Sequence, residues 1–244
     1  MLNFVYKTKP YDHQRDVLEE SWELTEHALF LEMGCGKSKI LLDNIAILYG
    51  QGKVDSALIV APKGVYDNWV VGEIPAHLPD YISARVFKWS PLETKKNQAL
   101  RKKALEQTFD LVFLIMNVEA LSTKKGTKFA FEFLFHKKAL FAVDESTTIK
   151  SPKANRTKNI VRLSKYAEYR RILTGAPVTR SPLDLYTQCE FLDPGLLGYG
   201  SFYSFRARYA EMINRTTGGR TFKQVIGYKR LDELNDLLKS FSSR

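Results

Sequence analysis

The segment Glu32-Met33-Gly34-Cys35-Gly36-Lys37-Ser38 decides the fold class of this sequence. It directly follows the short apolar run Ala28–Leu31 and opens a stretch with helical spacing, which is the context of a phosphate-binding loop. Glycines let backbone N–H groups turn toward phosphate oxygens, and the start of a helix adds partial positive charge. Leu31 departs from the usual pattern because it stands where the first glycine of G-x-x-x-x-G-K-[ST] belongs. A simple glycine turn before a helix is the alternative interpretation.

Two adjacent carboxylates, Asp144 and Glu145, end the apolar run Ala139–Val143. A carboxylate at the tip of a strand that neighbours a phosphate loop can hold Mg²⁺ through water, and a second one beside it can orient or deprotonate an attacking water. Paired acids at a strand end also arise by chance. Because a phosphate-loop pattern precedes them in the chain, we interpret them as its catalytic partners.

A third motif, Leu173-Thr174-Gly175-Ala176-Pro177, lies at the end of the apolar run Arg171–Thr174. Its small residues and proline predict a rigid turn whose hydroxyl and N–H groups lie near the terminal phosphate of a nucleotide. Such a turn can report hydrolysis to a second site. Taken alone, the same residues indicate only a strand-to-helix turn.

The alternation of apolar runs with helical stretches predicts an α/β fold. The runs lack strict polar–apolar alternation, which is typical of strands buried on both faces of a parallel sheet. We therefore expect a RecA-like P-loop NTPase domain with a mostly parallel, twisted sheet and helices on both faces. The expected strands are 28–31, 57–61, 111–116, 139–143 and 171–174. The expected helices are 37–49, 67–73, 95–107, 129–136 and 154–164.

The pattern changes after Pro182 to helices and loops. We expect residues 1–182 to form the core of one lobe and residues 183–244 to form its helical C-terminal extension. Within the extension the glycines Gly218-Gly219 predict a turn. The last residues carry no helix stop, so we expect the polypeptide to continue past Arg244 into a second lobe of similar size.

The composition indicates what class of molecule this is and which kinds of partner its charge suits. The 244 residues suffice for one large domain, and 37 basic against 27 acidic residues give a formal charge of +10. That excess suits a polyanion, although many basic domains only have solvated basic faces. The two cysteines indicate no disulfide framework, and no apolar run is long enough to span a membrane. We expect a cytoplasmic protein without a membrane segment.

The order of the motifs resembles the first lobe of superfamily-two helicases, and further segments resemble their Swi/Snf-type branch in a compact prokaryotic or phage form. The first set is Pro10-Tyr11-Asp12-His13-Gln14, Gly36-Lys37-Ser38, Leu58–Pro62 followed by Trp69, Asp144-Glu145 and Leu173–Pro177. The second set is Asp144–Lys150, Leu183–Tyr186, Phe205–Tyr209 and Leu231–Leu234. The Swi/Snf-type branch consists of ATP-driven translocases on double-stranded DNA.

The resemblance implies ATP and Mg²⁺ as cofactors and gives individual residues roles. Lys37, Asp144 and Glu145 would be catalytic, Ser38 and Asp144 would hold Mg²⁺, and Gln14 would read the adenine edge. Thr174 and Gly175 would couple the ATP site to the DNA site. The residues expected to contact the nucleotide are Tyr11, Gln14, Gly34, Cys35, Gly36, Lys37, Ser38 and Lys39. Those expected to face nucleic acid are Pro62, Lys63, Trp69, Asn117, Lys150, Lys153 and Arg156.

The expected partners are double-stranded DNA and the C-terminal helicase lobe of the same polypeptide, in a monomeric motor. We expect this lobe alone to bind nucleotide and to hydrolyse it slowly, because arginines from the second lobe would complete the site. Three other functions stay open: an RNA helicase lobe, the motor of a restriction system, and a nucleotide-dependent switch that binds a protein partner.

Overall fold

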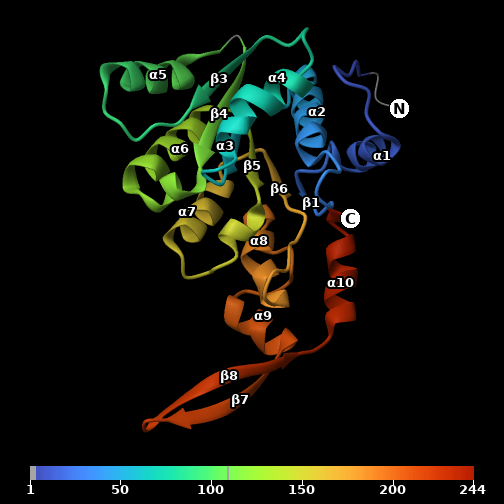
Figure 1. Cartoon of the computed structure of the whole chain (residues 1–244), viewed down its shortest axis with the longest axis vertical. Coiled ribbons are helices and arrows are strands. Elements are labelled where there is room, and N and C mark those ends of the chain that lie inside the picture. The colour runs from blue at the N-terminus through green and yellow to red at the C-terminus, as the bar shows by residue number, and fades with distance from the viewer. Residues whose placement is uncertain (1–3, 109) are drawn as a thin grey trace.

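Seven parallel strands form the central sheet of the computed structural model, which describes residues 4–108 and 110–244. Their order across the sheet is β3-β4-β2-β5-β6-β1-β9, and each neighbouring pair runs parallel. Figure 1 shows helices on both faces, which confirms the predicted α/β fold. The strands are β1 (Glu26–Leu29), β2 (Ser56–Ala61), β3 (Ala84–Lys88), β4 (Leu111–Asn117), β5 (Ala139–Asp144), β6 (Tyr169–Leu173) and β9 (Ser242–Ser243).

The sheet separates two apolar cores because successive side chains of a strand point to opposite faces. In β2, Leu58 and Val60 join the core beneath α6, α7 and α8, whereas Ala57 and Ile59 join the core beneath α1, α2 and α4. The helices are α1 (Asp12–Ser21), α2 (Lys37–Gly50), α3 (Tyr66–Asn68), α4 (Ile74–His77), α5 (Lys95–Glu106), α6 (Lys124–His136), α7 (Asn155–Ser164), α8 (Leu185–Leu192), α9 (Phe202–Tyr209) and α10 (Leu231–Lys239). None of the helices described is both long and apolar enough to cross a membrane.

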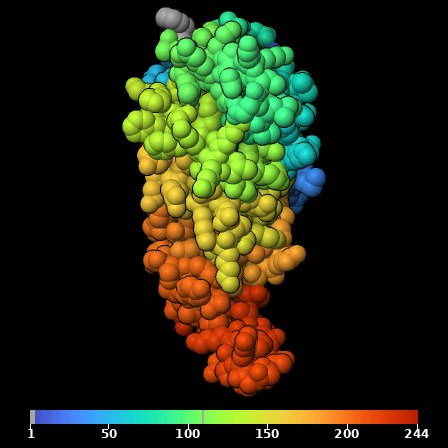
Figure 2. All heavy atoms as spheres, turned by 90° about the vertical axis from the view of Figure 1, so that its left-hand side faces the viewer, coloured from blue at the N-terminus to red at the C-terminus, as the bar shows by residue number. Residues whose placement is uncertain are grey.

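The C-terminal extension is not purely helical, which corrects the expectation for residues 183–244. Between α9 and α10 the chain forms an antiparallel hairpin of β7 (Ala210–Thr217) and β8 (Arg220–Tyr228). Its turn is Gly218-Gly219, as predicted, and both glycines have positive φ, 57° and 75°. Paired positive φ values are what a two-residue hairpin turn needs, because they match the twist of the strands. The hairpin projects from the body at one end of the long axis (Figure 1, Figure 2).

The end of the chain also differs from expectation. Ser242 and Ser243 form β9, the edge strand beside β1, where they pair with Ala28 and Leu29. The Ser243 hydroxyl lies 2.9 Å from Nε2 of His27, which is buried. Helix α10 therefore returns the chain from the hairpin to the sheet, next to the strand that carries the glycine-rich segment.

A buried arginine fixes α1 against the sheet. The Arg171 guanidinium, 1% exposed, donates to Asn44 Oδ1 at 3.0 Å and to the backbone carbonyls of Ser21, Leu24 and Thr25 at 3.1, 2.7 and 3.3 Å. Burial lowers the pKa of Arg171 to about 9. Because these acceptors belong to the end of α1, the segment after it and α2, one side chain on β6 positions the helix that carries Gln14.

Candidate nucleotide and nucleic-acid site

The glycine-rich loop between β1 and α2 has the shape of an anion cradle. Gly34 and Gly36 both have positive φ, 85° and 75°, and Gly36 caps the start of α2. The Lys37 ammonium folds back over the loop and donates to the carbonyls of Leu31 and Glu32, each at 3.0 Å. Backbone N–H groups at a helix start, together with a lysine over the loop, are the groups that bind phosphate oxygens.

Helix α1 packs on this loop through Gln14, which is 5% exposed. The side-chain oxygen of Gln14 accepts from the Tyr11 N–H at 3.1 Å, and its Nε2 donates to the Cys35 carbonyl at 3.1 Å. Nε2 of His13 donates to the same carbonyl, also at 3.1 Å. A Cβ added to Gly36 would lie 2.2 Å from Gln14 Nε2. The predicted adenine-reading amide thus already touches the phosphate loop, and the exposed ring of Tyr11 lies beside it.

Asp144 ends β5 as a buried carboxylate, 8% exposed. One oxygen accepts from the indole N–H of Trp69 at 2.9 Å, and the other accepts from the Glu145 N–H at 2.9 Å. Burial raises the pKa of Asp144, and the nearby charge of Lys37 lowers it. The influence of Lys37 on this pKa indicates that the two predicted catalytic groups lie near each other.

Trp69 does not face nucleic acid, which corrects the expectation for this residue. Its side chain is 1% exposed and packs in the core with α2 and β2. Only its N–H reaches the site, where it holds Asp144. A hydrogen bond between residues 75 positions apart leaves no trace in the sequence, so its supporting role could not be read there.

Glu145 connects the carboxylate pair to the motif after β6. It has φ 47°, an unusual backbone conformation for a residue other than glycine, and such conformations gather at functional sites. Its carboxylate accepts from the Thr174 hydroxyl at 3.3 Å. A Cβ on the next residue, Gly175, would lie 3.4 Å from the Met33 backbone nitrogen in the phosphate loop. The Leu173–Pro177 motif therefore lies between the acids and the loop.

Strand order explains this convergence. Leu173 of β6 pairs with Leu29 of β1 on one side and with Asp144 of β5 on the other. The carboxyl ends of parallel strands meet at one edge of a sheet, and two strand spacings amount to roughly 10 Å. We expected β5 to neighbour the strand of the phosphate loop, but β6 lies between them. The intervening strand therefore separates the phosphate loop from the acids by two strand spacings.

The polar groups fit a magnesium nucleotide rather than a metal held by protein alone. Among the described residues, no group of three or more His, Cys, Asp or Glu side chains could hold a metal ion. Asp144 also forms no ion pair with any described cation, and its carboxylate is held by the N–H groups of Trp69 and Glu145. Mg²⁺ usually takes one or two protein ligands and completes its shell with water and phosphate oxygens. Ser38, in the first turn of α2, and Asp144 match that requirement.

Lys39 lies outside the nucleotide site, which corrects its expected role. Its ammonium is buried and pairs with Asp43 at 2.6 Å. Burial raises the pKa of Asp43 to about 6 in spite of that pairing. Two positions along a helix rotate a side chain by about 200°, so Lys39 points away from the face of Lys37. The helical spacing itself predicts this separation.

Gln188 on α8 is a residue of the site that the sequence did not reveal. It is fully buried, and its oxygen accepts from the Ser146 hydroxyl at 2.6 Å. Its Nε2 donates to the carbonyls of Pro177 and Asp184, each at 2.8 Å. One amide thus joins the segment after the two acids to the turn after β6. No local motif marks Gln188, because its bond to Ser146 joins residues 42 positions apart.

Pro62, Lys63 and Asn117 lie at the edge of the sheet that carries the phosphate loop and the two acids, and their contact with nucleic acid stays a prediction. Pro62 and Lys63 directly follow β2, and Asn117 ends β4, where it pairs in register with Ala61. Lys63 is exposed. These residues therefore share one edge with the phosphate loop and the two acids.

The segment after Glu145 contains three residues predicted to contact nucleic acid, and they differ in their exposure and in their hydrogen bonds. The Lys150 ammonium lies 3.6 Å from Asp184 and also contacts the Thr179 hydroxyl. Arg156 Nε donates to the Thr148 carbonyl at 2.9 Å and so supports the segment. Lys153 is exposed, and the described residues offer it no hydrogen bond or ion pair. Of the three, Lys153 is the cation most accessible to a phosphate.

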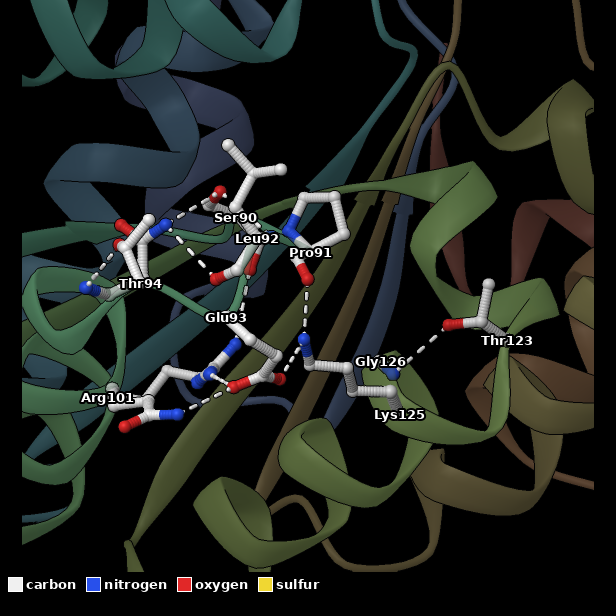
Figure 3. Close-up of polar contacts among 11 residues, drawn as sticks. Ser90, Pro91, Leu92, Glu93, Thr94, Arg101, Thr123, Lys125 and Gly126 are labelled. Carbon is white, nitrogen blue, oxygen red and sulfur yellow. Dashed lines mark hydrogen bonds and ion pairs between the residues drawn. The ribbon is translucent and has the colours of Figure 1, made fainter.

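Glu93 pairs with one cation on α5 and one on α6 (Figure 3). Its carboxylate accepts from Arg101 at 2.6 Å and contacts the Lys125 ammonium, which also donates to the Pro91 carbonyl. Hydrogen bonds, chiefly from Lys125, lower the pKa of Glu93 to about 2. Arg101 and Lys125 therefore hold the loop after β3.

Fold and site together define the class of this protein: a RecA-like P-loop domain whose phosphate loop, acidic strand tip and intervening turn converge at one sheet edge. The model of the SNF2-related domain family matches residues 13–244, and the chain belongs to that family. The Swi/Snf-type resemblance of the motifs is thereby confirmed.

Similar proteins include a chromatin-remodelling protein and a DNA repair and recombination protein. The chain is 26% identical to Protein CHROMATIN REMODELING 24 of Arabidopsis thaliana over 86% of its length. It is 24% identical to the human DNA repair and recombination protein RAD54B over 87% of its length. It spans 19% and 22% of those proteins. The solved Sulfolobus solfataricus SWI2/SNF2 ATPase core in complex with dsDNA matches with a TM-score of 0.71 and 19% identity, over the whole chain and 46% of that core.

Proposed function

We propose that this chain is the ATP-binding lobe of an ATPase that translocates on double-stranded DNA. The convergence of the phosphate loop with Asp144 and Glu145 across β6 supports this proposal most strongly. The family membership supports ATP hydrolysis by the polypeptide that carries the lobe. Bound ATP and Mg²⁺ would supply the reactive phosphoanhydride and a positive charge on its oxygens.

Each residue of the site has a defined task in this proposal. Lys37 leaves the carbonyls of the loop and moves to the phosphates, and Ser38 and Asp144 hold the metal. Glu145 orients the attacking water and accepts its proton. The Thr174 hydroxyl, already bonded to Glu145, registers the loss of the terminal phosphate. Preorganised groups of this kind act chiefly by positioning and electrostatics.

Double-stranded DNA is the proposed track for three reasons. The solved SWI2/SNF2 core that matches the whole chain was obtained with dsDNA, and a curated relative is a DNA repair and recombination protein. The chain itself carries a formal charge of +10. Lys63 and Lys153 are exposed cations at or near the nucleotide edge of the sheet. Phosphate contacts by such residues hold a duplex without reading its sequence.

The proposal includes a second lobe in the same polypeptide, since the chain covers 46% of the solved core. That lobe would supply arginines to the site from across the cleft. We also propose a monomeric motor in the cytoplasm of a prokaryotic or phage-infected cell.

ATP turnover by the intact polypeptide tests the proposal. Turnover should rise strongly with duplex DNA and vanish in a Lys37→Ala variant. Activation by RNA alone would favour an RNA helicase. Indifference to both nucleic acids would favour a nucleotide-dependent protein switch. A restriction-type motor would instead require a specific DNA sequence for activation.

A further inference from the structure

The β7–β8 hairpin carries an excess of positive charge beyond that of the chain. The hairpin, residues 210–228, contains three basic side chains and one acidic side chain, Glu211 at its base, and two more basic residues follow directly after β8. The five are Arg215, Arg220, Lys223, Lys229 and Arg230, and all are exposed. None forms an ion pair with any part of the chain that the structure describes. Since a folded surface normally intersperses both signs of charge, this one-sided charge is suited to an anionic partner.

The register of the hairpin sorts its side chains onto two faces. Arg215 lies directly opposite Phe222, and Arg220 lies opposite Thr217 on the same face. Met212 and Val225 form a pair on the other face and pack against the core beneath α9. The face with the two arginines is therefore the one turned away from the body.

That outward face combines charge with exposed apolar surface. Phe222 is 49% exposed and Ile213 is 40% exposed, beside Arg215 in the ladder. The hairpin has strands of eight and nine residues, so it reaches about 27 Å from its base. Figure 1 shows it as a slender projection, and Figure 2, which views it end-on, shows it as the lowest part of the molecule.

We propose that this hairpin is an arm that binds the phosphate backbone of duplex DNA. The inference rests on the proposed function and adds a contact surface outside the nucleotide edge of the sheet. A two-stranded ribbon fits the major groove, which is about 12 Å wide. On the outward face Arg215 and Arg220 contact phosphates, and Phe222 lies against the sugars. Because phosphate contacts carry no sequence information, the arm increases grip on any sequence.

The test measures duplex binding by the chain with fluorescence anisotropy across a salt series. The variant is Arg215→Ala/Arg220→Ala, and the control Lys95→Ala/Lys96→Ala removes the same charge from α5. Figure 1 shows α5 at the far end of the molecule. Losing two phosphate contacts should flatten the slope of log affinity against log salt by about 2. The control should keep the slope of the unchanged chain.

Further variants and controls distinguish the proposal from its alternatives. An Arg215→Lys/Arg220→Lys variant keeps the charge and should keep duplex binding. Equal losses in the hairpin variant and the α5 control would show a net charge effect and overturn the arm, as would an unchanged slope in the hairpin variant. If the unchanged chain binds no duplex while binding ATP, the proposed function itself fails. Melting temperatures of all variants should agree, because the altered side chains are exposed.

Discussion

At the scale of single residues, Gly36 shows how tightly the phosphate loop and α1 are fitted. Gly34 and Gly36 both have positive φ, but only Gly36 has a neighbour where its Cβ would lie, the amide of Gln14. A left-handed backbone costs a residue other than glycine about 1–2 kcal/mol. Alanine at position 34 would therefore cause backbone strain alone, whereas alanine at position 36 would cause the same strain and a clash with α1.

We expect Gly34→Ala to lower the free energy of unfolding by about 1–2 kcal/mol and Gly36→Ala to lower it further. Adding Gln14→Ala to Gly36→Ala should remove the clash, so the double variant should cost less than the sum of the single ones. Urea denaturation of the four proteins measures this cycle. Additive costs would show that Gln14 does not press on the loop.

Trp69 offers a second test at this scale, because its indole N–H holds the Asp144 carboxylate. Trp69→Phe keeps the ring in the core but removes the donor. Groups that orient a metal ligand typically contribute about ten- to hundredfold to metal affinity. The intact protein should therefore need correspondingly more Mg²⁺ for ATP turnover. Trp22→Phe, whose ring lies outside the site under Lys53, is the matched control. An unchanged Mg²⁺ requirement would contradict the role given to Trp69.

At the scale of elements, the central strands were predictable because they are buried on both faces. The apolar runs located β2, β4 and β5 within one residue of their observed ends, and β1 and β6 within two. Strand β3 (Ala84–Lys88) escaped because it lies at the sheet edge and mixes basic with apolar residues. Strand β9 escaped because two serines carry no apolar signal. Edge strands are defined by their neighbours, which a local pattern does not contain.

The hairpin was missed for a different reason. Its glycine pair was recognised as a turn, but the residues after Pro182 were expected to form helices and loops. In the structure α9 stops at Tyr209, and the flanks of the turn carry Thr, Ile, Val and Phe, which favour strands. The same limit applies to the residues of the candidate site. Residues that belong to one loop could be predicted from the sequence, whereas contacts between elements, such as those of Gln188, could not.

Gln188 permits a prediction about the element it belongs to. Gln188→Leu keeps α8 packed but leaves the buried Ser146 hydroxyl without its acceptor and removes one donor each from the part-buried carbonyls of Pro177 and Asp184. An unmet buried group costs about 1–3 kcal/mol, so the free energy of unfolding should fall by at least about 1 kcal/mol. Because Gln188 ties the segment after the acids to the turn after β6, kcat of the intact protein should fall more than KM changes.

A neighbour on the same helix supplies the control for that experiment. The Thr187 hydroxyl donates to the Ile149 carbonyl at 2.6 Å and touches neither the turn after β6 nor Ser146. Thr187→Val should therefore reduce stability while leaving kcat nearly unchanged. Equal effects of the two variants on kcat would show that Gln188 acts only through the stability of α8.

At the scale of the whole molecule, the nucleotide residues occupy one edge of one sheet. The phosphate loop, both acids and the Leu173–Pro177 turn all belong to this edge. The charge of Lys37 lowers the pKa of Asp144. Phosphoryl transfer spreads negative charge over the oxygens of the transferred group, and arginines that reach it increase the rate about a thousandfold or more. In the proposed motor those arginines come from the second lobe.

The 244-residue chain by itself should therefore bind Mg-ATP but turn it over at least about a thousandfold more slowly than the intact polypeptide. Binding of a fluorescent ATP analogue and phosphate release measure the two properties on the same preparation. A Glu145→Gln variant of the intact polypeptide defines the background rate, since it lacks the base but keeps both lobes. Turnover by the lone chain within tenfold of the intact protein would mean that this sheet edge holds every group that the reaction needs, and the two-lobed mechanism would have to be abandoned.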